Sequence, residues 1–325
     1  MTLPPLRFQP LIKRTLWGGR RLGDLGKPIG DGNDYAESWE IVDHGEDQSV
    51  VTGGRAGDLR GMTLAAVMST VGDRLMGRGV PRNSFPLLLK YLDCNRVLSV
   101  QVHPDDAYGA KMTPPDLGKT EAWFVVHAEP DATIYAGLRP GTTRDRLTEA
   151  IRSGDTESCL HQFHPEPGDV VFIPAGTVHA LGGGLVIAEI QQSSNTTFRL
   201  FDWNRTDANG NSRPLHIEPA LEVIDFHGGP ISPVRGERSQ SGRQNLIRCD
   251  KFTLDGLYDG TADVAVGDRF EIITVPIGSA TLRSGNETER LERGDTVLVP
   301  ADSDGGELTV DDDSIALIMG LPQRD

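Results

Sequence analysis

The sequence predicts a mainly all-β protein built around a β-barrel, with small helical insertions and a second, degenerate β domain. Three observations support this fold class. The 325 residues include 38 glycines and 21 prolines, a density of turn residues that is typical of proteins made of many short strands. Short runs of β-branched and apolar residues lie between these turns, and one strand-and-turn pattern occurs twice.

The stretch Gly168–His179, G-D-V-V-F-I-P-A-G-T-V-H, combines a strand, a turn and a candidate metal ligand. Residues 170–173 form a short apolar run, and Gly-Asp before it and Pro-Ala-Gly after it bound it as a buried strand. A second strand is expected over 184–190. His179 should therefore lie near the rim of a hairpin, where an imidazole can point into the mouth of a barrel. A single histidine at such a place is more often structural than a ligand, so the rest of the chain decides.

The first 102 residues combine strands with one helical insertion. Strands are expected over 3–16, 37–42 and 85–102, the last interrupted by a turn at 93–95. Alternation along the second of these places Glu40 on the face opposite Trp39 and Ile41. Between 57 and 79 the apolar spacing becomes helical, and Thr63 is the expected N-cap.

A second helical insertion is expected near 141–163, where residues 143–152 carry an apolar stripe at helical spacing. A short helix is expected over 218–225, and residues 228–245, rich in Gly, Pro, Ser and Arg, predict a linker. These patterns predict a catalytic domain over 1–235, followed over 236–325 by the end of the linker and a structural C-terminal β domain.

The C-terminal part contains the repeat. Residues Gly294–Asp302 echo Gly168–Gly176, and the position that corresponds to His179 is Gly305. The second copy thus keeps the strand and turn but lacks the histidine. We interpret it as a degenerate copy with a structural role, although so short a repeat can also arise by chance from common turn residues.

Composition excludes several classes of partner. The formal net charge of −15 repels nucleic acid and anionic membranes, so an anionic substrate would need a local basic pocket. Three cysteines without a C-x-x-C pair predict neither a disulfide framework nor a cysteine zinc site. No signal-peptide core and no membrane-length apolar run is present, so a cytoplasmic protein is expected, with no obligate protein partner evident.

Four polar residues form a candidate metal site. Gln101 and His103 lie two apart on an expected strand, so both side chains leave the same face about 6.6 Å apart. Glu121 opens the next strand and shares a face with Lys119, and His179 completes the set. Mixed nitrogen and oxygen ligands suit a catalytic Zn²⁺ ion, while Mn²⁺, Fe²⁺ or Co²⁺ would also tolerate them.

Four motifs, Q-V-H-P-D, K-T-E, G-T-V-H-A and R-L-F-D-W-N-R, occur in this order. Together they resemble the short bacterial type I mannose-6-phosphate isomerases of the cupin superfamily. The likeness runs from Trp17-Gly-Gly to about Phe226 and includes E-S-W-E and L-H-I-E-P-A-L-E-V-I-D-F. It implies a cupin, or jelly-roll, barrel that interconverts mannose 6-phosphate and fructose 6-phosphate through an ene-diol(ate).

The resemblance also implies roles for individual residues. One Zn²⁺ ion per chain would be bound by Gln101, His103, Glu121 and His179, the catalytic arginine would be Arg199, and Lys119 would lie in the active site. The substrate would be a phosphorylated hexose, for which Trp17 and Glu40 are our candidate contacts. The general base stays open among Lys119, Glu40 and a metal-bound water.

The chain departs from the family pattern just before the arginine. Many members have Asp-x-x-Tyr-Arg where this sequence has Asn195-Thr-Thr-Phe198-Arg199, so a carboxylate and a phenol are replaced. A non-catalytic, metal-containing cupin that senses sugar is therefore an alternative. A cupin oxygenase using Fe²⁺ is a third, although its usual site needs neither Lys119 nor Arg199.

Overall fold

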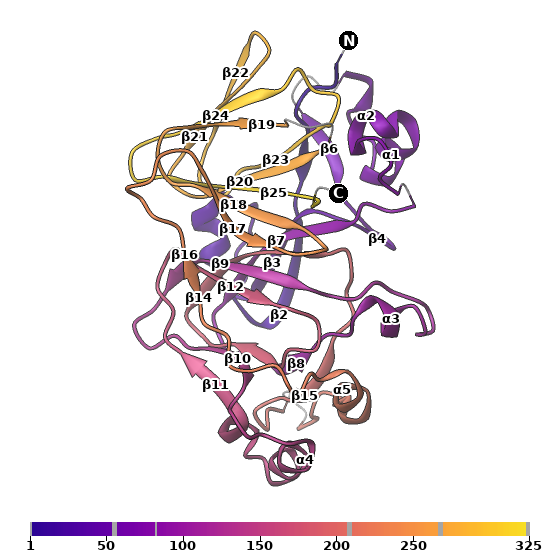
Figure 1. Cartoon of the computed structure of the whole chain (residues 1–325), viewed down its shortest axis with the longest axis vertical. Helices are drawn as coiled ribbons and strands as arrows, with labels where there is room; N and C mark the ends of the chain where they lie inside the picture. Colours follow the sequence, from indigo (N-terminus) through magenta and orange to yellow (C-terminus); the bar gives the residue numbers. More distant parts are fainter. Residues whose placement is uncertain (1, 54–56, 82, 207–209, 266–268, 323–325) are drawn as a thin grey trace.

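A computed structural model of the chain describes residues 2–53, 57–81, 83–206, 210–265 and 269–322. Strands dominate, and they form two stacked β-sandwich halves (Figure 1). The mainly all-β prediction is confirmed. No helix among the described residues is long and apolar enough to cross a membrane.

The N-terminal half contains two facing sheets, which we call the long sheet and the site sheet. In sheet order the long sheet consists of β16 (Val234–Arg235), β12 (Asp169–Ile173), β9 (Glu121–Ala128), β14 (Leu185–Gln192), β7 (Leu87–Cys94), β3 (Tyr35–Ile41) and β2 (Leu11–Gly19). The site sheet consists of β11 (Leu160–Phe163), β10 (Ile134–Leu138), β13 (His179–Leu181), β8 (Val100–Val102) and β15 (Phe198–Phe201). Apolar side chains from both sheets, including Val125, Ile134 and Ile187, form the core between them.

The C-terminal half repeats this arrangement on a smaller scale. One sheet has the order β17 (Arg243–Arg248), β18 (Thr253–Leu257), β25 (Ile315–Gly320), β20 (Glu271–Ile277) and β23 (Thr296–Val299). The other has the order β19 (Thr261–Val264), β24 (Gly306–Val310), β21 (Ala280–Ser284) and β22 (Glu287–Leu291). Gly168 before β12 and Gly294 before β23 have φ of 95° and 88°, which explains why both copies of the repeated pattern begin with glycine.

Helices and short pairs of strands complete the fold. The helices are α1 (Leu64–Val71), α2 (Asp73–Met76), α3 (Asp106–Gly109), α4 (Arg144–Ser153) and α5 (Ile217–Val223), with 3-10 turns at Arg21–Leu25, Gly57–Leu59 and Thr156–Cys159. The small sheets pair β1 (Arg7–Gln9) with β6 (Val50–Gly53) and β4 (Asp43–His44) with β5 (Asp47–Gln48). Thr63 caps α1 by accepting a hydrogen bond from the backbone of Ala66, as expected.

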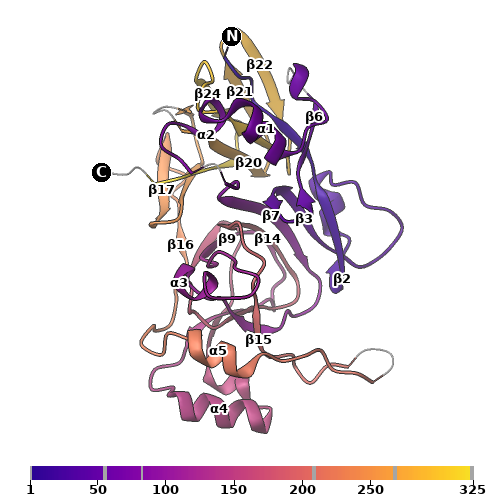
Figure 2. The same cartoon turned by 90° about the vertical axis from the view of Figure 1, so that its right-hand side faces the viewer.

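Helices α4 and α5 cover the outer face of the site sheet (Figure 2). Leu147 and Ile151 of α4 and Leu221 of α5 pack into one buried cluster with Val100 and Leu200 of the sheet. This packing fixes the orientation of the sheet. Alternate residues on its strands then face the opposite direction, toward the long sheet.

Three expected segments differ in extent from the structure. The single strand expected over 3–16 is two strands, β1 and β2. In the region expected to form strands over 85–102, β7 continues into the predicted turn as far as Cys94, and the strand expected over 96–102 is limited to β8. The predicted linker over 228–245 is shorter, because β16 joins the edge of the long sheet and β17 begins at Arg243. Arg235 holds β16 there through an ion pair with Asp169 (2.6 Å).

The two halves share one hydrophobic core. It joins Leu6 and Phe85 to Phe252, Phe270 and Leu298 from the C-terminal half. The Phe85 and Phe270 ring centroids are 4.7 Å apart. The insertion with α1 and α2 also lies beside the C-terminal half (Figure 1), where the backbone N–H of Ala301 donates to Leu75 (3.0 Å). The proposed boundary near residue 235 therefore crosses continuous packing.

We expect a chain that ends after Arg235 to be less soluble, or to unfold at a lower temperature, than the full chain. The truncation would expose the apolar surface around Leu6 and Phe85 to water. Thermal unfolding and the soluble fraction on expression would measure the effect. A soluble truncated chain with an unchanged melting temperature would contradict a stabilising role for the C-terminal half.

A point substitution tests the same shared core in the intact chain. All four tryptophans lie before residue 204, so tryptophan fluorescence reports only on the N-terminal half. Phe270→Ala should lower the unfolding free energy seen by this signal by about 3–5 kcal/mol, the usual effect of such a cavity. The exposed Thr288→Ala is the matched control in the same half and should leave the transition in place.

Candidate active site

The register of the site sheet places three of the expected residues in one row. Gln101 on β8 lies opposite His179 on β13 on one side and opposite Arg199 on β15 on the other. Residues directly opposite each other in antiparallel strands leave the sheet on the same face. The outer face is packed against α4 and α5, so this row faces the long sheet.

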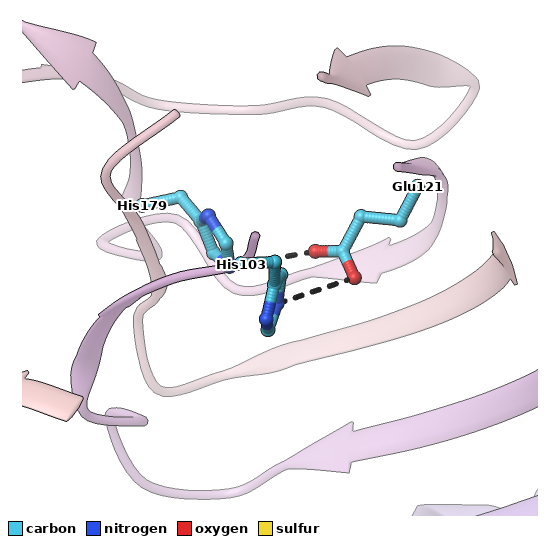
Figure 3. A group of neighbouring side chains, drawn as sticks. All are labelled: His103, Glu121 and His179. Carbon is cyan, nitrogen blue, oxygen red and sulfur yellow. Dashed lines mark ion pairs between the residues drawn. The ribbon is translucent and has the colours of Figure 1, made fainter. Parts of the chain in front are cut away.

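His103 and Glu121 complete a compact cluster with His179 (Figure 3). His103 follows β8, and Glu121 begins β9, where it pairs with Ile173 at the end of β12. One ligand atom from each of the three residues lies within 4.8 Å of the others. The Glu121 carboxylate spans both imidazoles, with Oε1 3.4 Å from His179 Nε2 and Oε2 3.6 Å from His103 Nε2.

Both histidines present Nε2 to the cluster. Their Nδ1 atoms lie 2.8 Å and 2.9 Å from the carbonyl oxygens of Thr196 and Thr177, which accept the Nδ1 proton and leave Nε2 unprotonated in the cluster, where Nε2 of His103 lies 3.0 Å from Lys119 Nζ. Burial and the nearby Lys119 lower the pKa of His103 well below its ordinary value and that of His179 to about 4. Both rings are therefore neutral near pH 7, which metal ligation requires.

Glu121 supplies the negative charge of the cluster. Burial, followed by repulsion from Glu189, raises its pKa to about 7. Its Oε1 is buried and has no hydrogen-bond partner among the described residues. A buried carboxylate oxygen of this kind facing two imidazole lone pairs fits a divalent cation.

Gln101 is the fourth expected ligand and lies beside the other three. Its Nε2 is 3.2 Å from His179 Nε2. A half-turn of the amide would exchange its nitrogen and oxygen, so the same side chain can present an oxygen to a bound ion. The four residues that the sequence suggested as ligands are thus adjacent in space.

A cavity of about 390 Å³ opens above this cluster between the two sheets. Gln101, Lys119, His179 and Arg199 line it, as predicted from the sequence, together with Trp17. The structure also adds residues that the sequence reasoning missed. These are Glu37, Lys90, Trp123, Glu189 and Arg213.

Lys90, Glu189 and Lys119 form a buried network on the long sheet. Lys90 Nζ is 3.0 Å from Glu189 and 3.3 Å from Glu37, and Lys119 bonds to Glu121 and lies 3.6 Å from Glu189. Burial disfavours the charged form of Lys90, but Glu189 and Glu37 outweigh it and raise the pKa of Lys90. Burial likewise disfavours ionised Glu189, but the two lysines outweigh it and lower the pKa of Glu189.

One signal in the sequence could have revealed this network. Lys90 is the one charged residue in the buried run Leu87–Leu92, and Glu189 is the one charged residue in β14. A charge inside a fully buried strand requires a partner of opposite charge. The register of β7 against β14 places these two residues directly opposite each other.

Arg199 reaches the cavity from the far end of the row. Its Nη1 donates to the carbonyl of Pro214 (2.9 Å) and its Nε donates to the Ser99 hydroxyl (3.3 Å). Burial and the neighbouring Arg213 lower the pKa of Arg199 from its ordinary value of 12.5. The nearby Asp202 pairs with Arg205 and Arg213 rather than with Arg199.

The two departures from the family pattern lie in different places. Phe198 packs away from the cavity, with its ring centroid 5.7 Å from that of Tyr108. The replaced phenol position therefore belongs to the core under α5 in this chain. Asn195 lines the cavity, so only the replaced carboxylate changes the wall of the site.

Glu40 is the one expected site residue that the structure places neither in the cluster nor on the wall of the cavity. Its carboxylate is buried on the opposite face of β3, where Lys27 Nζ (2.7 Å) and the Ser38 hydroxyl (2.6 Å) contact it. Glu37 lines the cavity, because Glu37 and Trp39 share the face of β3 whose neighbours on β7 are Leu92 and Lys90. Alternation along the strand placed Glu40 opposite Trp39 correctly, but it did not show which face turns toward the site. The expectation that Glu40 also lies opposite Ile41 is wrong, because a register shift after Trp39 pairs Ile41 with Leu89 and puts it on the same side as Glu40, beside Tyr91.

The chain is similar to proteins of known function over almost its whole length. A family profile described as "Phosphomannose isomerase type I, catalytic domain" matches residues 6–122. Mannose-6-phosphate isomerase ManA of Bacillus subtilis (strain 168) is 36% identical over 307 residues, which cover 92% of this chain and 94% of the relative. Mannose-6-phosphate isomerase of Streptococcus mutans is 33% identical over 300 residues, covering 91% and 92%.

Solved structures give the same result for the fold. The crystal structure of mannose 6-phosphate isomerase from Bacillus subtilis superposes with a TM-score of 0.83 at 29% identity, covering 97% of this chain and 99% of that one. A putative mannosephosphate isomerase from Archaeoglobus fulgidus superposes with a TM-score of 0.78 at 23% identity, covering 99% and 100%, and supports the fold alone. The architecture is therefore cupin-like, as the resemblance implied. With a site containing two histidines and a glutamate, and with relatives similar along its whole length, the chain belongs to the type I mannose-6-phosphate isomerase family and is an isomerase.

Proposed function

We propose that this enzyme interconverts mannose 6-phosphate and fructose 6-phosphate through an ene-diol(ate), with one Zn²⁺ ion per chain. The observation that carries the proposal is the buried cluster of His103, Glu121 and His179, which opens into a cavity lined by lysine and arginine. An aldose-ketose isomerase must remove a proton beside a carbonyl and stabilise the negative oxygens that result. The first requirement calls for a base beside the sugar, and the second for a cation and fixed positive charges in the same cavity.

Gln101, His103, Glu121 and His179 would hold the ion. Two neutral imidazoles, a carboxylate and an amide oxygen suit Zn²⁺ and leave a position open for a substrate oxygen. When bound, Zn²⁺ supplies positive charge where the sugar oxygens become negative. The relatives are mannose-6-phosphate isomerases by name, and we place the reaction in the cytoplasm.

Arg199 would act on the developing charge of the ene-diolate. Its guanidinium is held in place by Ser99 and Pro214, both neutral partners, so its charge is not cancelled by a direct ion pair. A fixed donor that needs no rearrangement during the reaction is the most effective kind of electrostatic catalyst.

Lys119 and Glu189 are suited to handle protons. Glu189 is ionised and lines the cavity without belonging to the ligand set, so it can accept the proton that leaves the sugar carbon. Lys119 lies between Glu121 and Glu189 and can donate to a sugar oxygen. Trp17 covers the cavity as a contact for the sugar, whereas Glu40 lies outside these contacts.

A coupled assay of mannose 6-phosphate isomerisation tests the function directly. We expect turnover that is lost after treatment with a chelator and restored by added Zn²⁺, because the ion supplies the charge that the ene-diolate needs. Activity that is unaffected by complete metal removal would contradict the proposed site. A protein that binds Zn²⁺ but gives no turnover would favour the sugar-sensing alternative.

Replacement of one ligand tests the metal site independently of activity. We expect His179→Ala to bind well below one metal ion per chain, because a buried imidazole nitrogen is lost from the cluster. Metal analysis of the purified protein gives the stoichiometry. His127→Ala on β9 is the control, and full Zn²⁺ content in His179→Ala would show that the ligands are assigned wrongly.

Replacement of Arg199 tests its catalytic role. We expect Arg199→Ala to reduce kcat by roughly 10²- to 10³-fold, the usual effect of losing one preorganised donor to a developing oxyanion. Arg199→Lys should also be impaired, because an ammonium lacks the planar fork. Steady-state kinetics at verified zinc content would measure both, and wild-type kcat in both variants would exclude the assignment.

A further inference from the structure

A second cavity of about 720 Å³ adjoins the active-site cavity. The two share Thr15, Trp17 and Arg213 as a common wall. The outer cavity is lined mainly by the loop after β15 and by residues of β2. Arg213 therefore stands at the boundary between the metal cluster and the outside of the molecule.

The positive charges of the two cavities differ in how they are balanced. In the active-site cavity, Lys90 and Lys119 are paired with buried carboxylates. The described residues that line the outer cavity include three guanidinium groups, those of Arg96, Arg205 and Arg213, and only one carboxylate, that of Asp202. A local excess of positive charge therefore lies on the wall of the outer cavity, in a protein whose formal net charge is −15, and Arg199 adds a further guanidinium without a direct ion pair in the active-site cavity.

Arg213 and the neighbouring Arg205 differ in their hydrogen-bond partners. Arg205 donates to Asp202 and also to the backbone oxygens of Val97 (2.6 Å) and Asp202 (3.2 Å), which hold it between its own loop and the segment before β8. Arg213 makes a two-pronged contact with Asp202, through Nε (2.7 Å) and Nη2 (2.5 Å). That contact orients the guanidinium and uses two of its five N–H groups.

Thr15 provides a second observation at the same wall. Its hydroxyl oxygen is buried and finds no hydrogen-bond partner among the described residues. A buried hydroxyl without a partner is unfavourable unless a ligand or water satisfies it. Thr15 lines both cavities beside Arg213, so a ligand at the boundary could contact both.

We propose that Arg213 binds the phosphate group of the substrate at this boundary, with the Thr15 hydroxyl as a second donor and Asp202 as the positioning residue. The inference rests on the proposed function, since it assumes a hexose 6-phosphate whose first two carbons face the metal cluster. A guanidinium fork matches the geometry of phosphate oxygens and forms stronger, charge-assisted hydrogen bonds. The lysines beside the candidate metal site are then left to the sugar end of the substrate, and the outer cavity, whose lining has three guanidinium groups and one carboxylate, receives the dianion.

The test compares Arg213→Gln and Arg213→Lys with the wild type. For Arg213→Gln we expect KM for mannose 6-phosphate to rise roughly 10-fold or more, with kcat within about 3-fold, because a ground-state contact to a charged group is lost. Arg213→Lys keeps the positive charge but lacks the guanidinium fork, so its KM should lie between those of the wild type and Arg213→Gln. Arg14→Gln is the control. Arg14 is exposed, lies on the same strand as Thr15 and forms an ion pair with Asp34.

Binding of inorganic phosphate, measured by calorimetry, separates this inference from the proposed function. Weaker phosphate binding by Arg213→Gln would support the phosphate site even if the wild type did not isomerise mannose 6-phosphate. Unchanged phosphate affinity and unchanged KM in Arg213→Gln would overturn the inference while leaving the isomerase intact. A fall in kcat at unchanged KM would also overturn it, because the residue would then act on the reacting carbons.

Discussion

The buried charge of the N-terminal half is the constraint on which the rest of the site depends. Glu121 and Glu189 are removed from water, and each would be strongly unfavourable there without a cation close by. Lys90 on β7 and Lys119 just before β9 meet this requirement, and the histidines add neutral nitrogen donors from β13 and from the residue after β8. The register of each sheet therefore decides both whether the fold tolerates these charges and whether a metal can be held among them.

The residues of the candidate site come from different strands of the two facing sheets. The ligands come from the two facing sheets, so the site exists only when the sandwich is closed. The row of Arg199, Gln101 and His179 is fixed by the pairing of three strands and supported from behind by α4 and α5. These helical insertions therefore fill the space behind the row in a mainly β chain.

The sequence allowed the cluster of candidate ligands to be predicted, because His103, Glu121 and His179 each occur beside a strand end with clear turn residues. It did not reveal the partners that lie across the sheet. Lys90 and Glu189 face each other only through the register of β7 and β14, and Arg213 reaches the cavity from a loop whose course no local pattern specifies. Glu40 shows the same limit, since alternation defines two faces of a strand but not which of them meets the site. The repeat predicted a second β unit, yet its packing against Leu6 and Phe85 depends on contacts distant in sequence.

The shared core has a consequence for how the protein is made. Arg7 forms an ion pair with Glu289, 282 residues later in the chain, and Leu6 forms a β-bridge with Leu298. A ribosome that adds about 5–20 residues per second needs roughly 14 to 56 s to synthesise the intervening segment. During that time the apolar face around Leu6 and Phe85 has no native partner. The nascent chain should therefore depend on chaperones until its last strands emerge, even though every metal ligand has already been synthesised.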